Sequence, residues 1–228
     1  MGTVITSSSN PKLRLVHRLL DSRRQREKEG LFVVEGEDLV QAADDAGIEP
    51  VEVFRAGEDV EPELLARVST MAHPPRVLGI YRREALPRGV EPVSLALWHV
   101  ADPGNLGTIL RTADAFGASV ALSPGCADPT GPKALRASAG AVFRVPLAGF
   151  DEPDGKRVAL VSHGGWPLAE LDPGVPVVYV LGAEREGLPE EVVGTCDERA
   201  TIPLAAGAES LNVAVAAAIA LYEHRRGR

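Results

Sequence analysis

Hydrophobic positions in the first third of the chain follow two spacings, that of a helix and that of a strand. Apolar side chains recur at helical intervals within residues 12–28, which predicts one basic helix there. The same two spacings predict further helices near 37–46 and 62–69, and strands at 31–34, 51–55 and 76–81. This alternation predicts a small α/β domain over residues 1–84, and the Pro- and Gly-containing stretch 85–92 is predicted to be a linker.

Beyond residue 92 the apolar runs become longer and richer in β-branched residues. Unbroken apolar strands are typical of a parallel sheet that helices cover on both faces. The strands are predicted at 93–100, 119–122, 142–145, 158–161 and 175–181, and the helices at 105–116, 131–139, 189–193 and 210–225. We therefore predict a second domain over residues 93–228, a parallel α/β unit whose ligands bind at the carboxyl ends of the strands.

Bulk composition narrows the classes of protein that the chain can represent. It has 228 residues, 45% of them hydrophobic, which is enough for a substantial core. No run approaches the ~20 apolar residues that a membrane span requires, and no secretory signal is evident, so a cytoplasmic protein is expected. The two cysteines and five histidines show no metal-ligand spacing, and no metal site is predicted.

Charge is distributed unevenly along the chain. Residues 10–28 contain seven Lys or Arg against two acids, although the net charge of the whole chain is −8. A basic arm on an acidic body can contact phosphates without binding every polyanion. A solvated helix face is an equally weighted interpretation. The candidate phosphate-binding residues are Lys12, Arg14, Arg18, Arg23, Arg24 and Arg26.

The segment 102–117 follows a predicted strand and places polar residues within an apolar helical pattern. Asn105 is a good N-cap residue, and capping would explain it without any substrate. Arg111 lies about 1.7 turns beyond that cap in an otherwise apolar helix. It either contacts a substrate or pairs on the surface with Asp114, three residues farther on. Residues that break a local pattern in this way indicate a functional site.

Two later segments show the same feature. Glu184 follows Gly182 at the end of a hydrophobic strand, where a glycine most often only makes a turn, and no G-x-G-x-x-G dinucleotide motif is present. Farther on, Ser210 and Asn212 open an alanine-rich helix. A capping role explains Ser210 without a ligand but leaves Asn212 unexplained.

In their order and residue content, these three segments resemble the SpoU/TrmH class of RNA methyltransferases. These enzymes have a trefoil-knotted fold and transfer a methyl group from S-adenosylmethionine to a ribose 2′-hydroxyl. The resemblance covers residues 93–223 closely and residues 7–43 more loosely. It implies a knotted parallel-sheet methyltransferase domain at 93–228 and a smaller, ribosomal-protein-like α/β RNA-binding domain at 1–84. Arg185 departs from the small residue expected at its position.

The resemblance also implies roles for individual residues. Arg111 corresponds to the catalytic arginine of the class. Because arginine stays protonated, with a pKa above ~12, we expect it to hold a phosphate and stabilise charge on the ribose oxygen while another group takes the proton. The implied catalytic residues are Asn105, Arg111, Glu184, Ser210 and Asn212. The implied cofactor-binding residues are Gly182, Ile202 and Leu211.

Partners follow from the same resemblance. Members of the class usually dimerise through the catalytic domain, which implies a homodimer. The N-terminal module implies ribosomal RNA as the substrate in preference to transfer RNA. Three alternatives stay open: a tRNA ribose methyltransferase, a noncatalytic RNA-binding or ribosome-assembly factor of the same fold, and an unrelated nucleotide-dependent α/β enzyme. The missing P-loop and dinucleotide motifs count against the last of these.

Overall fold

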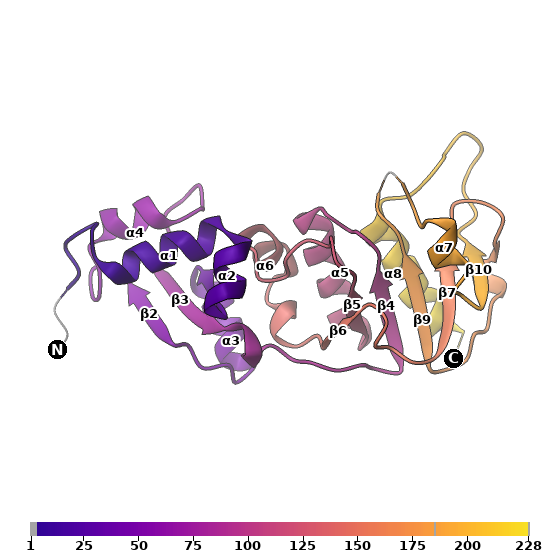
Figure 1. Ribbon diagram of the computed structural model, residues 1–228, viewed down its shortest axis with the longest axis horizontal. Helices are drawn as coiled ribbons and strands as arrows, with labels where there is room; N and C mark the ends of the chain where they lie inside the picture. Colours follow the sequence, from indigo (N-terminus) through magenta and orange to yellow (C-terminus); the bar gives the residue numbers. More distant parts are fainter. Residues whose placement is uncertain (1–3, 185, 228) are drawn as a thin grey trace.

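Two sheets lie one after the other along the long axis of the molecule (Figure 1). The structure is a computed structural model, and it describes residues 4–184 and 186–227. The N-terminal half, residues 4–84, is at the left of Figure 1, and the C-terminal half, residues 93–227, is at the right. Helices α5 (Pro103–Phe116) and α6 (Pro132–Ser138) lie between the two sheets.

The N-terminal sheet is antiparallel, with the strand order β1-β3-β2. Successive side chains of a strand point to opposite faces, so Val33 and Ile80 pack with the core of α1 and α4, whereas Phe32 and Tyr81 pack toward α3 and the C-terminal half. The elements are α1 (Pro11–Asp21), α2 (Arg23–Glu29), β1 (Leu31–Glu35), α3 (Glu37–Asp45), β2 (Glu52–Arg55), α4 (Pro62–Val68) and β3 (Val77–Arg82). Both faces of this small sheet are therefore covered.

The single helix predicted over residues 12–28 is wrong, because the chain forms two helices there. Ser22 ends α1 by donating its N–H to the Arg18 carbonyl, and it begins α2 by accepting the N–H of Gln25 on its side chain. Its backbone is extended, with φ −128° and ψ 118°. The basic residues therefore lie on two helices and not on one continuous helical face.

The C-terminal sheet is parallel in every pairing among the described residues, with the order β6-β5-β4-β9-β7-β10-β8. Its strands are β4 (Val93–Leu97), β5 (Ser119–Leu122), β6 (Leu147–Gly149), β7 (Lys156–Leu160), β8 (Trp166–Pro167), β9 (Val177–Leu181) and β10 (Glu198–Thr201). Helices α7 (Glu190–Val193) and α8 (Val213–Arg226) complete the half. Because β4 and β9 are neighbours, the loops that follow them meet at one edge of the sheet.

The strand predicted at 142–145 is wrong. Residues Ala141–Phe143 form a short 3₁₀ helix, and the strand comes later, at β6. Val142 and Phe143 are buried, so the apolar run marks burial and not extended backbone, two states that so short a run does not distinguish. Strands β8 and β10 were not predicted, because the first has only two residues and the second contains charged residues.

The stretch 85–92, predicted to be a linker, is bound to the C-terminal sheet. The N–H of Leu147 in β6 donates to the Pro87 carbonyl at 3.0 Å, and the N–H of Gly89 donates to the Leu147 carbonyl at 3.3 Å. Leu86 is buried in the larger hydrophobic core. The connection therefore runs along the sheet as ordered chain.

One hydrophobic core contains residues from both halves of the molecule. The rings of Phe32 and Tyr81 in the N-terminal sheet lie 6.4 and 6.3 Å, centroid to centroid, from the ring of Phe143 in the C-terminal half. At Gly140 an added Cβ would lie 2.5 Å from the Cβ of Ala42, so the backbone of the C-terminal half touches α3 directly. The two halves are therefore in direct contact through buried side chains and backbone.

Candidate active site

A pocket of about 380 Å³ opens at the carboxyl ends of β7, β9 and β10. Its volume lies in the range of small-molecule sites, ~300–1,000 Å³. The predicted site residues that line it are Gly182, Glu184, Ile202, Ser210 and Leu211. The position agrees with the expectation that ligands of a parallel sheet bind at its carboxyl edge.

Asp102, and not Asn105, caps helix α5. The helix begins at Pro103, and the Asp102 carboxylate accepts the N–H of Asn105 at 2.9 Å. Proline is favoured at the first helical position, which explains the earlier start. This hydrogen bond, followed by the ion pair with Lys133 at 3.0 Å, lowers the pKa of Asp102. The Asn105 carboxamide is not used as a cap and is free to make other contacts.

The cap of the last helix also differs from the prediction. Asn212 caps α8, because its side-chain oxygen accepts the N–H of Ala214 at 2.9 Å and that of Val215 at 3.4 Å. Serine and asparagine are equally good caps, so residue type alone does not choose between them. Ser210 lies in the exposed loop before the helix and lines the pocket.

Asn105 connects the three sequence motifs by hydrogen bonds. Its Nδ2 donates to Oε1 of Glu184 at 2.6 Å, and its Oδ1 accepts from Nδ2 of Asn212 at 3.0 Å. Asn105 and Asn212 are 107 positions apart in sequence. A hydrogen bond to a carboxylate is stronger than one between neutral groups, so this network holds Glu184 in place at the pocket wall.

Gly182 lies where the loop after β9 folds back on itself. An added Cβ at this position would lie 2.1 Å from the carbonyl carbon of Gly187, closer than any side chain allows. The N–H of Gly187 donates to the Ala183 carbonyl at 2.9 Å and closes the turn. A larger residue at position 182 would therefore open the pocket wall. Arg185, in the same loop, lies outside the described residues.

Arg111 is exposed on α5 and is not part of the Asn105 network. Within residues 4–184 and 186–227 it makes no hydrogen bond or ion pair. The alternative pairing with Asp114 is wrong, because Asp114 holds Arg144 at 2.6 Å. The Arg111 guanidinium therefore has its donors available for a ligand.

The basic residues of the arm have different surroundings. Three are exposed and lack an ion pair with any described residue: Arg14, Arg18 and Arg24. Lys12 is exposed and pairs with Glu52, and Arg23 is exposed and pairs with Glu27 at 2.8 Å. Exposed pairs of this kind contribute little to stability and can be exchanged for a phosphate.

Arg26 corrects the prediction for the arm, because its side chain is only 7% exposed. Its Nε donates to Oδ2 of Asp128 at 2.7 Å, and its Nη1 donates to the Leu19 carbonyl at 2.7 Å. The break at Ser22 removes Arg26 from the face that it would occupy on one continuous helix. A guanidinium held in this way is not offered to RNA.

Sequence reasoning missed part of the pocket wall. Ser162 and His163 follow β7 and line the pocket. Their position directly after a parallel strand is a signal that could have identified them. Beside the predicted Glu184, two further carboxylates among the described residues line it: Glu186 and Glu190. Arg199 lines it as well and pairs with Glu190 at 3.2 Å.

The described residues include no helix long and apolar enough to cross a membrane. Within the same ranges, no group of three or more His, Cys, Asp or Glu side chains is arranged to hold a metal ion.

Comparison with known families accounts for most of the chain. Residues 92–222, more than half of the sequence, match the SpoU rRNA Methylase family. The chain belongs to this family. Residues 10–80 match the MRM3-like substrate binding domain. The family predicted from the three motifs is confirmed.

Two relatives align with nearly the whole length of this SpoU family member. The 23S rRNA (guanosine(2553)-2′-O)-methyltransferase RlmP of Bacillus subtilis is 31% identical, and the alignment covers 98% of this chain and 99% of RlmP. An uncharacterised tRNA/rRNA methyltransferase of Synechocystis is 32% identical over 97% of this chain and 93% of its own.

Solved structures agree with this assignment. The AdoMet-bound rRNA methyltransferase from Sinorhizobium meliloti has a TM-score of 0.88 and 30% identity, covering 99% of this chain and 98% of that one. The SpoU methyltransferase AviRb from Streptomyces viridochromogenes, in complex with AdoMet, has a TM-score of 0.85 and 25% identity, covering 96% and 98%. The predicted fold class, the S-adenosylmethionine cofactor and the RNA methyltransferase class are confirmed.

Proposed function

We propose that this SpoU family member methylates a ribose 2′-hydroxyl of ribosomal RNA, in preference to transfer RNA. The observation that carries the proposal is the hydrogen-bonded series Glu184, Asn105 and Asn212, in which the three sequence motifs meet beside the pocket that Glu184 lines. RlmP, similar to this chain along its whole length, is named for 2′-O-methylation of 23S rRNA. The cytoplasm is the proposed location, because the aligned relatives are bacterial proteins and bacterial ribosomal RNA is cytoplasmic.

The pocket residues suit S-adenosylmethionine. Apolar side chains such as Leu160, Ile202 and Leu211 can cover an adenine ring, and the carboxylates of Glu184 and Glu186 can offset a positive charge. When bound, the cofactor supplies an electrophilic methyl group on a sulfonium that departs as a neutral thioether. The tight turn at Gly182 allows the backbone to approach the adenosine closely.

Arg111 is assigned to the RNA in this proposal. It is exposed, and its donors are available for a phosphate next to the target ribose. Its permanent positive charge stabilises the negative charge that develops on the ribose oxygen, while a phosphate oxygen or a neighbouring group takes the proton. Ser210 and Asn212 act near the ribose, and Asn105 orients Glu184.

The N-terminal half is proposed to bind RNA. We assign residues 1–84 to an RNA-binding domain and residues 93–228 to the methyltransferase domain, with 85–92 between them. The match of residues 10–80 to a substrate-binding domain supports this division. The proposed phosphate contacts are Lys12, Arg14, Arg18, Arg23 and Arg24.

A homodimer formed through the C-terminal domain is also proposed. Val215 and Tyr222 lie about two turns apart on α8 and are 47% and 55% exposed. Exposed apolar side chains on one helix are typical of a protein interface. Analytical ultracentrifugation is expected to show a dimer, and the double substitution Val215→Asp, Tyr222→Asp is expected to give a monomer. A monomeric wild type would contradict this part of the proposal.

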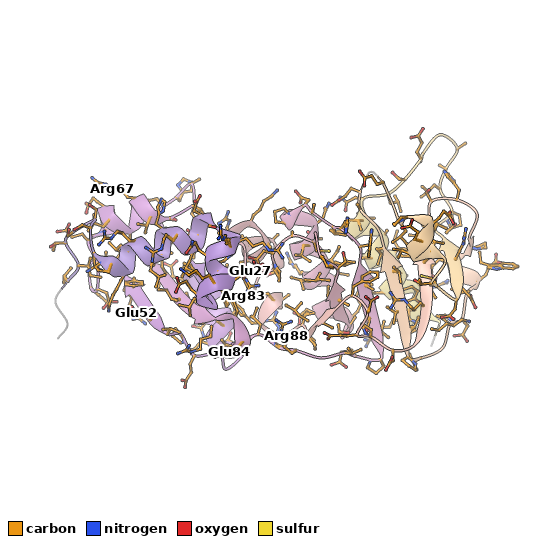
Figure 2. The ribbon with its side chains drawn as sticks, in the orientation of Figure 1. Glu27, Glu52, Arg67, Arg83, Glu84 and Arg88 are labelled. Atoms are coloured by element: carbon orange, nitrogen blue, oxygen red, sulfur yellow. The ribbon has the colours of Figure 1, made fainter. Side chains whose placement is uncertain are left out.

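Methyl transfer tests the proposed activity directly. Tritiated S-adenosylmethionine is incubated with 23S rRNA, 16S rRNA or tRNA, and the labelled nucleotide is identified after nuclease digestion. Label is expected at a ribose of rRNA, and Arg111→Ala is expected to lower the rate about 10²- to 10³-fold, the loss typical of removing one charge-stabilising donor. The control is Arg88→Ala, an exposed arginine of the segment between the two domains that Figure 2 labels.

The outcomes separate the alternatives. Label in tRNA alone would replace rRNA by tRNA as the substrate. Binding of rRNA without any Arg111-dependent label would favour a noncatalytic assembly factor and refute the proposed activity. Label on a base instead of a ribose would refute the proposed position of transfer.

A further inference from the structure

A buried ionic cluster joins the two halves. Oδ2 of Asp128, in the loop after β5, accepts from Nε of Arg26 at 2.7 Å, and its Oδ1 accepts from Nη1 of Arg83 at 3.0 Å. The hydroxyl and the N–H of Thr130 add hydrogen bonds to Oδ1 at 2.7 and 3.0 Å. The Asp128 side chain is 4% exposed. Figure 2 shows Arg83 where the N-terminal half meets the C-terminal half.

The environment keeps Asp128 ionised despite its burial. Burial is the largest single influence and by itself would raise the pKa of Asp128. The charge of Arg83 and the hydrogen bonds from Thr130 and Arg26 together outweigh it, and the pKa lies below its ordinary value. Both carboxylate oxygens of Asp128 accept from arginines of the N-terminal half, Arg26 and Arg83.

A second buried carboxylate at the junction repeats this arrangement with the roles of the two halves exchanged. Glu35, at the end of β1, has a side chain that is 2% exposed and accepts from Nη1 of Arg136 in α6 at 3.0 Å. The Ser69 hydroxyl and the Thr70 N–H donate to the same carboxylate, each at 2.8 Å. Here the carboxylate comes from the N-terminal half and the cation from the C-terminal half.

Helix α6 links this junction to α5, the helix that carries Asn105 and Arg111. Arg136 of α6 holds Glu35, and Lys133 of the same helix pairs with Asp102 at 3.0 Å. The Asp102 carboxylate also accepts the N–H of Asn105, in the first turn of α5. Two polar contacts, one from each of two residues of α6, therefore connect the N-terminal half through this helix to Asn105, the residue at the centre of the pocket network.

We propose that Asp128 and Glu35 are positioning residues that fix the basic helices α1 and α2 at a set distance and orientation from the pocket. This inference rests on the proposed function. The enzyme then selects RNA in which a phosphate track and the target ribose have one relative arrangement, as in a folded RNA, because a fixed junction does not adapt to other spacings. A flexible linker would admit many spacings. The gain in RNA affinity from contacts at both the basic helices and the pocket depends on whether the geometry permits both contacts at once.

The test compares the wild type with the double variant Asp128→Asn, Glu35→Gln. We expect KM for folded rRNA to rise about tenfold or more, because the hydrophobic contacts that remain between the halves are not directional and no longer hold the two RNA contacts in one arrangement. We expect kcat and the dissociation constant of S-adenosylmethionine to stay within about twofold, because neither residue lines the pocket. Limited proteolysis within residues 83–92 is expected to become faster. Glu35→Gln alone is a milder variant in case the double variant folds poorly.

A matched control loses the same two negative charges elsewhere. Asp151→Asn with Glu170→Gln changes two exposed carboxylates of the C-terminal half and is expected to leave KM and proteolysis unchanged. An unaltered KM in the double variant would overturn the proposal, and so would a loss of cofactor affinity, since the two residues would then support the pocket itself. A wild type that methylates no RNA would refute the proposed function. In that case the proteolysis experiment still tests the role of the two carboxylates. Cleavage within residues 83–92 that is no faster in the double variant than in the wild type would overturn the inference.

Discussion

The pocket and the junction between the halves each contain a carboxylate in a polar network, but they differ in how fully it is used. At the pocket, Glu184 is half-buried and accepts one hydrogen bond, from Asn105, among the contacts of the described residues. At the junction, Asp128 is buried and both of its oxygens are taken by Arg26 and Arg83. A carboxylate with unused capacity suits a ligand, whereas a fully paired one suits a fixed structure. This comparison predicts that substitutions at the two sites change different properties.

The largest expected effect on stability is at the junction. Asp128→Ala leaves two guanidinium groups facing a buried gap, and breaking a buried pair in this way costs about 3–5 kcal/mol of unfolding free energy. Urea denaturation measures the loss. Asp128→Asn keeps the shape and is expected to cost less. A loss below about 1 kcal/mol for Asp128→Ala would make the junction no different from a surface pair.

The next expected effect, at the pocket, is a loss of activity with little loss of stability. Asn105→Ala is expected to slow methyl transfer about 10²-fold, because Glu184 loses its hydrogen-bond donor. The free energy of unfolding is expected to change by less than about 1 kcal/mol, because the cap of α5 uses the Asn105 backbone and not its side chain. Thr108→Ala, exposed on the same helix, is the control for both measurements. A large loss of stability with unchanged transfer would contradict the distinction.

A smaller effect is expected where the two regions are connected. Asp102→Ala removes the N-cap of α5 and is expected to cost about 1 kcal/mol in thermal or urea unfolding. Asp102→Asn keeps a capping oxygen and loses only the exposed pair with Lys133, so it is expected to cost less than about 0.5 kcal/mol. Equal losses in the two variants would show that the ion pair, and not the cap, matters here.

The smallest effect near neutral pH is the pH dependence of the junction. The pKa of Asp128 is lower in the folded chain than the unfolded value of ~3.9, so ionised Asp128 favours folding above that value. This contribution is lost as the pH falls through the folded pKa. The difference in unfolding free energy between wild type and Asp128→Asn is therefore expected to be constant from about pH 8 to 5 and to shrink below about pH 4. A difference that grows on acidification would contradict the assigned cause.

Local signals in the sequence predict much of the fold, and one of them marks a helix start that the hydrophobic spacing alone does not show. The spacing Ser22-x-x-Gln25 is a capping-box pattern, and it marks the start of α2 inside the segment predicted to be one helix. The choice between Ser210 and Asn212 as cap is different. It depends on where α8 starts to pack through Val213 and Ala214, which residue type does not reveal.

Long-range contacts account for what local patterns could not predict. Arg26 reads as one more cation of the arm, yet its partner Asp128 lies 102 positions away and draws it into the junction. The motifs were sufficient to predict that Gly182, Glu184 and Leu211 line one pocket. They were not sufficient to place Arg111, whose proposed partner is an RNA phosphate and not another side chain.

The pairing of Pro87 and Gly89 with Leu147 has a consequence for the catalytic half as an isolated fragment. Strand β6 is the outermost strand on its side of the sheet, and the connecting segment occupies the N–H and the carbonyl of Leu147 in that strand. An uncovered outer strand offers N–H and carbonyl groups to other molecules and favours aggregation. A fragment that begins at residue 93 would keep the pocket residues but expose that strand, so the segment that joins the halves also protects the methyltransferase sheet from self-association.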